Sequence, residues 1–99
     1  MAHSSARIET ERASIYLQQL CKHFAHKLPV TFTPEQGQIA FSAGICRLEA
    51  SDGVLVLKAD AEDDARLGQL QGVIDKHLLR FAFRDPPKIE WHAAAAAQA

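Results

Sequence analysis

The densest group of chemically reactive side chains lies in the seven residues from Cys21 to Lys27. This run holds one thiol, two imidazoles (His23 and His26) and two ammonium groups within about two helical turns. Thiols and imidazoles bind metals, an imidazole transfers protons near neutral pH, and ammonium groups attract anions. Basic residues also suit a helix carboxyl terminus, where the helix dipole favours cations. A ligand site and a structural helix end are both open at this point.

The element that carries this run is predicted to be an amphipathic helix between Thr10 and Pro29. Thr10 is a good N-cap residue, and Pro29 disfavours helical geometry at the residue before it. Apolar residues recur at helical spacing and predict a core face of Ala13, Leu17, Leu20, Cys21, Phe24 and Leu28. Cys21 points roughly 140° away from His23 and His26 on this helix, so it cannot share a ligand with them.

Four alternating segments follow and predict strands at residues 30–33, 38–41, 45–50 and 54–59. Glycine-containing turns separate them, which favours an antiparallel meander. The inward-facing residues are predicted to be Val30, Phe32, Ile39, Phe41, Cys46, Leu48, Leu55, Leu57 and Ala59. Ile45, Val54 and Val56 point outward, which suits either a modest dimer contact or ordinary exposed surface.

A second helix is predicted after Asp60, which suits an N-cap, with carboxylates at residues 62–64 in its first turn. Its predicted core stripe is Leu67, Leu70, Ile74, Leu78 and Phe81. Gly68 and Gly72 lie on the opposite face and each lower helix propensity by about 1 kcal/mol relative to alanine.

Short edge strands are expected at residues 6–9 and 88–92. The fold class is therefore α+β: a two-layer domain with an antiparallel, mainly meander sheet of about five to six strands and two helices packed on one face. The single domain is expected to span residues 6–92, and residues 1–5 and 93–99 to be disordered tails.

Composition limits the classes of function. The chain has 99 residues, 47% of them hydrophobic, which suits one modest core. A formal net charge of -1 disfavours binding to nucleic acid or to an anionic membrane surface. Residues 1–13 lack the continuous apolar segment of a signal peptide, so we expect a cytoplasmic protein. Cys21 and Cys46 are expected to be reduced thiols with a structural role.

A metal site built from His23, His26 and His77 is the first chemical possibility. Four meandering strands between the helices predict antiparallel helices, which separates His23 from His77 by about 15 Å and excludes a shared ion. The same topology brings Lys22, His23 and Lys27 towards the acidic turn at 62–64. With three strands instead, the helices would be parallel and His23 could lie beside His77.

One candidate ligand site remains, and its residues are Tyr16, His23, His26, Lys27 and His77. Tyr16, His23 and Lys27 form a stripe along the edge of the first helix, and His77 and Arg66 have the matching edge position on the second. Such residues either line a groove or cover apolar surface with their long side chains. The cations would suit a small anionic, oxygen-rich ligand. The sequence identifies no cofactor and no metal.

Two segments, residues 16–27 and 77–84, resemble a bacterial family catalogued as domain-of-unknown-function family 2218. The resemblance implies an accessory part in iron–siderophore utilisation, with a siderophore-interacting, flavin-dependent ferric reductase as partner. It implies no activity for the domain itself, and this chain has no flavin-binding module of its own.

Three functions stay open. The first is a non-enzymatic binding or accessory protein that uses the candidate site. The second is a metal-dependent or acid–base enzyme that uses His23, whose ordinary pKa near 6.5 suits proton transfer. The third is a homo-oligomeric interaction module, such as a homodimer, built on Ile45, Val54 and Val56.

Overall fold

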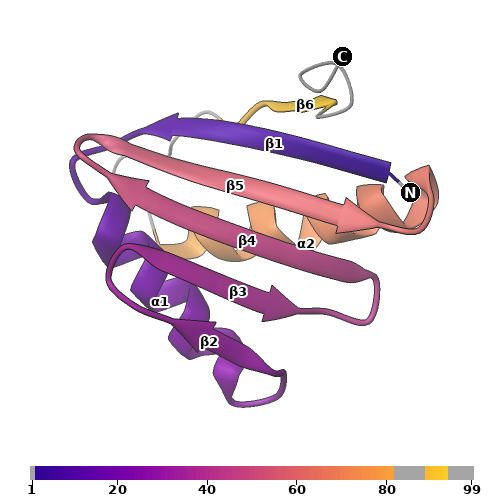
Figure 1. Cartoon of the computed structure of the whole chain (residues 1–99), viewed down its shortest axis with the longest axis horizontal. Helices are drawn as coiled ribbons and strands as arrows, with labels where there is room; N and C mark the ends of the chain where they lie inside the picture. Colours follow the sequence, from indigo (N-terminus) through magenta and orange to yellow (C-terminus); the bar gives the residue numbers. More distant parts are fainter. Residues whose placement is uncertain (1, 82–88, 94–99) are drawn as a thin grey trace.

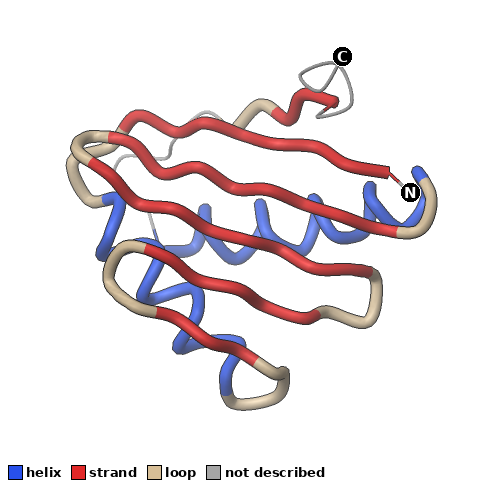
Figure 2. The backbone as a smooth tube through the Cα atoms, in the orientation of Figure 1, coloured by secondary structure: helices blue, strands red, loops and turns tan. Residues whose placement is uncertain are grey.

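The computed structural model describes residues 2–81 and 89–93, and both helices lie on one face of a single sheet (Figure 1, Figure 2). The elements in chain order are β1 (Ala2–Glu9), α1 (Ala13–Ala25), β2 (Val30–Phe32), β3 (Gln36–Ala40), β4 (Gly44–Ser51), β5 (Val54–Ala61), α2 (Asp64–Phe81) and β6 (Trp91–Ala93). The α+β two-layer fold class predicted from the sequence is confirmed.

The sheet has six antiparallel strands in the order β2-β3-β4-β5-β1-β6. Strands β2 to β5 form the predicted meander, and β1 pairs with β5 along its whole length (Figure 1). Gly53 turns the chain between β4 and β5 with a φ of 72°, a conformation that other residues rarely adopt. The three longest strands, β4, β5 and β1, lie next to one another in the sheet.

The core lies between the sheet and the two helices. Inward residues of the central strands are at most 1% exposed: Ile39, Cys46, Leu48, Leu55, Leu57 and Ala59. The helices contribute the other side of the core, with Leu17, Leu20 and Cys21 from α1 and Leu70, Ile74 and Leu78 from α2. Val30, Phe32 and Phe41 are partly buried against its margin. The predicted inward pattern is confirmed for the described side chains, because strand alternation and helical periodicity each place their apolar residues on one face. The side chain of Phe81, also predicted in the core stripe, lies outside the described part of the structure.

The amino terminus differs from the prediction. Residues 2–5 were expected to belong to a disordered tail, but they form the first half of β1. Ser4, Ala6 and Ile8 all face inward, but Ser4 is polar, so the alternation of apolar and polar residues cannot be recognised at this end of the strand. Ser4 is only 3% exposed, and its hydroxyl accepts a hydrogen bond of 2.6 Å from the Gln71 side chain on α2. The contact with Gln71 thus satisfies the buried Ser4 hydroxyl, whose polarity made the strand hard to predict from the sequence.

Both predicted N-caps are wrong. The Thr10 hydroxyl accepts a hydrogen bond from the Arg12 amide at 3.1 Å, and α1 begins only at Ala13. Asp60 lies within β5, which continues to Ala61 because β1 and β4 pair with it on both sides. The Asp63 carboxylate accepts the Arg66 amide at 2.8 Å instead and caps α2.

The last strand, expected at residues 88–92, is Trp91–Ala93 and pairs with β1 at the sheet edge. Its Trp91 indole donates a 2.8 Å hydrogen bond to the Asp75 carboxylate on α2. The tail was expected at 93–99, but Ala93 ends β6, and residues 94–99 lie outside the described residues. Neither described helix has the length and apolar character needed to span a membrane.

Candidate functional site

Four aromatic rings meet where the carboxyl-terminal halves of the helices approach the turn between β3 and β4. The His23 ring lies 4.9 Å from the His77 ring and 5.1 Å from the Phe24 ring, measured between centroids. Phe24 in turn contacts His77 at 4.7 Å and Phe41 at 4.8 Å. We call these four residues the ring cluster. It joins both helices to the β3–β4 turn.

The proximity of His23 and His77 contradicts the predicted separation of about 15 Å. That prediction placed two antiparallel helices side by side along the strands. In the structure α2 runs nearly along the strands, whereas α1 crosses them obliquely (Figure 1). The two helices therefore meet near their carboxyl-terminal ends, although four strands separate them in the sequence as predicted.

The acidic turn before α2 consequently does not receive the basic end of α1. Arg66 occupies it instead, with its guanidinium 3.1 Å from the Glu62 carboxylate and 2.9 Å from that of Asp63. His23 lies at the other end of α2, where the charges of His77 and Arg80 act on it. The predicted pairing of Lys22, His23 and Lys27 with residues 62–64 is therefore wrong.

The orientation of the His77 ring is set by its own helix. Its Nδ1 lies 2.8 Å from the Val73 carbonyl oxygen, which can only accept a hydrogen bond. The neutral ring therefore carries its proton on Nδ1, and Nε2 is the basic nitrogen. A ring held in one tautomer can accept a proton at Nε2 and then donate it to a bound anion.

A groove of about 500 Å³ runs from His77 along α2, with the β3–β4 turn as its opposite wall. We call it the α2 groove. The turn contributes residues 41–43, and the helix contributes Gln69, Leu70, Gly72, Val73, Lys76 and His77. The volume falls within the range of small-molecule sites, about 300–1,000 Å³. Its walls are largely apolar, and its basic groups gather at the ring-cluster end.

Among the described residues, the charges that act on His23 at that end are all positive. The pKa of His23 is lowered, first by loss of hydration and then by the positive charges of His77, Arg80, His26 and Lys27. A bound anion would offset this repulsion and favour the protonated form of His23. The same charges disfavour a divalent cation there. Within the described residues, no group of three or more His, Cys, Asp or Glu side chains is placed to hold a metal.

The structure brings together only part of the predicted site. His23 and His77 share the ring cluster, and His26 and Lys27 lie close enough for their charges to act on His23. Tyr16 is 7% exposed and belongs to the hydrophobic core. His26 is exposed at the carboxyl-terminal cap of α1. The candidate site therefore keeps the two helix ends and loses Tyr16.

Sequence reasoning named His77 but missed the other residues of α2 that line the groove. Val73, Lys76 and His77 are spaced at i, i+3 and i+4, so they form one stripe beside the core stripe, which Arg80 continues beyond the groove. Their shared helical face was readable from that spacing. Its use as a groove wall was not, because it depends on the turn at Phe41, which is distant in sequence.

The two cysteines are buried and free, as predicted. Burial raises the pKa of Cys21 to about 11. Burial also raises the pKa of Cys46, and the charges of Cys21 and Asp60 add to this rise. Both thiols are therefore protonated near neutral pH and inert as nucleophiles or metal ligands.

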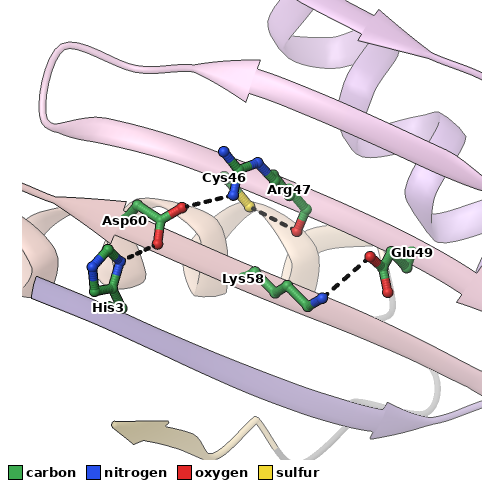
Figure 3. A network of polar contacts seen from close by, with 6 residues as sticks. All are labelled: His3, Cys46, Arg47, Glu49, Lys58 and Asp60. Carbon is green, nitrogen blue, oxygen red and sulfur yellow. Dashed lines mark hydrogen bonds and ion pairs between the residues drawn. The ribbon is translucent and has the colours of Figure 1, made fainter. Parts of the chain in front are cut away.

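A second set of polar contacts lies on the sheet face that no helix covers (Figure 3). Asp60 pairs with His3 at 2.5 Å and with Arg47 at 3.2 Å, while Lys58 pairs with Glu49 at 3.3 Å. All three pairs join neighbouring strands. The Arg47–Asp60 and Lys58–Glu49 pairs match opposite charges across the sheet, which is the ordinary stabilising pattern of an exposed antiparallel sheet.

The fold and groove thus define a small α+β protein with one uncovered sheet face and a basic, partly apolar groove. The chain belongs to the family described as an uncharacterized protein conserved in bacteria (DUF2218), whose model matches residues 5–92. This confirms the family indicated by residues 16–27 and 77–84.

A solved structure supports the same assignment. The protein PA4090 from Pseudomonas aeruginosa, determined by NMR, is similar to this chain at 35% sequence identity with a TM-score of 0.78. The similarity covers 93% of this chain and 96% of that one. No curated protein matches the chain.

Proposed function

We propose that this protein binds a small, oxygen-rich organic anion in the α2 groove and acts as an accessory binding protein rather than as an enzyme. The observation that carries the proposal is the position of His77. This side chain lies at the groove's end, in ring contact with His23, and the described charged groups that act on His23 there are all basic. Hydrogen bonds from cationic side chains to anionic oxygens are stronger than neutral ones.

The groove also suits the organic part of such a ligand. Val73 lines it from the helix and Phe41 lines it from the turn, so a ligand with an apolar body would remove apolar surface from water there. Lys76 lies beside His77 on the same wall and would contact an anionic group at that end. Catecholate compounds, including siderophores, have this combination of an aromatic ring and anionic oxygens.

Resemblance to the family adds a cellular setting to the proposal. It implies a part in iron–siderophore utilisation alongside a siderophore-interacting protein. In this setting the protein works in the cytoplasm and holds a siderophore, or a fragment of one, for the partner reductase.

Calorimetry with 2,3-dihydroxybenzoate and with a catecholate siderophore, ferric and iron-free, tests the function. The variants His77→Ala and Lys76→Ala should each weaken binding by about tenfold or more, because a hydrogen bond to a charged group contributes about 1.5–3 kcal/mol. His92→Ala and Lys58→Ala, which remove the same side chains from exposed sites elsewhere on the sheet, should bind as the wild type does. Heat signals that are absent for every ligand, or equal in all variants, would contradict the proposal.

A further inference from the structure

Two glycines interrupt α2, and they differ in what they face. Gly68 and Gly72 are both exposed, and a Cβ atom added at either would meet no atom within 4 Å. Gly72 lines the α2 groove, whereas Gly68, one turn earlier, does not. Packing inside the protein therefore requires neither glycine. Glycine in a helix interior nevertheless weakens the helix relative to alanine.

Space at Gly72 is available to an occupant of the groove. Without a Cβ, the helix surface at this position is bare backbone, and a ligand can approach it closely. Leu70 and Val73 flank this bare strip, and Phe41 and Ala43 form the opposite wall. A flat ring fits between a bare helix surface and an apolar wall better than a bulky aliphatic group does.

The polarity of the groove orients such a ring. Lys76 and His77 follow Gly72 by one helical turn, so cationic side chains lie at one end of the bare strip. Gln69 lies one turn before Gly72 and carries no charge. An anionic substituent on the ring would therefore point towards His77.

We propose that the α2 groove is selective for small aromatic anions, whose ring lies flat on α2 at Gly72, and that Gly72 is a specificity-determining residue. This inference rests on the proposed function, since it names the ligand class of the same groove. It also explains why a glycine stands at position 72, although glycine lowers the stability of the helix.

The test compares Gly72→Ala with Gly68→Ala. Both substitutions should raise the melting temperature by about 4–8 °C, because each removes a helical glycine without a clash. Binding of 2,3-dihydroxybenzoate, measured by calorimetry, should weaken by about tenfold or more in Gly72→Ala, since the added methyl overfills the contact. Gly68→Ala should bind it as the wild type does.

A small anion without a ring distinguishes the contribution of the aromatic ring to binding from that of the charge. Acetate, followed by NMR titration, should bind wild type and Gly72→Ala equally, because it contacts only the cationic end. Unchanged or tighter binding of 2,3-dihydroxybenzoate by Gly72→Ala would overturn the selectivity while leaving the proposed function in place. Failure of the wild type to bind either anion would overturn the proposed function and this inference together.

Discussion

At the scale of single residues, the molecule's distinctive feature is the contact between two imidazoles among further cations. His23 and His77 lie 4.9 Å apart, and the pKa of His23 is lowered by lost hydration and by its basic neighbours. An anion bound in the groove beside His77 would oppose the electrostatic part of this shift. The pKa of His23 should thus report whether an anion occupies the groove.

This arrangement makes stability depend on pH. The folded protein binds a proton at His23 less tightly than the unfolded chain, whose imidazole titrates near 6.5. The free energy of unfolding should therefore fall as the pH drops from about 6.5 to the lowered pKa, and His23 should contribute no further change below that. His77→Gln should raise the pKa of His23 and weaken this dependence. NMR titration of the imidazole carbons checks the first effect, and urea unfolding at several pH values checks the second. An unchanged pKa of His23 in the variant would contradict the coupling.

At the scale of elements, the sequence predicts which residues face the core but not how the helices cross. Apolar spacing identifies the core faces of α1 and α2 because each periodicity is local. The angle between the helices depends on how side chains interlock with the sheet and with each other. His23 and His77 were therefore recognised as candidates, but their contact was not predicted. Ser4 is a second case that local periodicity cannot predict, since its hydroxyl can be buried only because Gln71, distant in sequence, donates a hydrogen bond to it.

The pairing of β4 with β5 depends on a close backbone approach at Gly44. A Cβ atom at this position would lie 2.1 Å from the Asp60 carbonyl oxygen. Gly44→Ala should therefore lower the free energy of unfolding by about 3 kcal/mol or more, because the neighbouring backbone cannot move aside cheaply. Gly68→Ala is the matched control and should raise it by about 1 kcal/mol. Chemical denaturation measures both, and a neutral Gly44→Ala would show that the strands separate at little cost.

The docking of β6 on α2 depends on the hydrogen bond from Trp91 to Asp75. Desolvation raises the pKa of Asp75, and this bond opposes the rise. Trp91→Phe should raise that pKa further and cost about 1–2 kcal/mol of stability at pH 7, where the carboxylate loses its donor. The loss should be smaller at acidic pH, where Asp75 is protonated. His92→Ala, on the adjacent exposed residue, should leave the pKa of Asp75 unchanged in an NMR titration.

At the scale of the whole molecule, the uncovered sheet face decides whether the protein associates with itself. Ile45 pairs with Asp60, and Val56 lies between Glu49 and Arg7 in the strand register. In the described part of this face, charged residues thus flank the outward apolar ones and break them into small patches. Such patches are typical of ordinary monomer surface.

We therefore predict a monomer in solution. Sedimentation velocity should give a single species near 10.9 kDa. Val56→Lys should sediment identically, because the substituted side chain lies on a face exposed to water in the monomer. A wild-type dimer that this substitution dissociates would instead establish the homo-oligomeric function considered from the sequence.

The most direct test of the anion-binding groove is an NMR titration of all the imidazole rings with 2,3-dihydroxybenzoate. We predict saturable shifts of the His23 and His77 ring signals and a rise in the pKa of His23, since His77 lines the groove and its ring contacts that of His23. His3 and His92, which lie on β1 and β6 away from the groove, should not shift. Unmoved His23 and His77 signals at millimolar ligand, or shifts centred on His3, would contradict binding in the α2 groove.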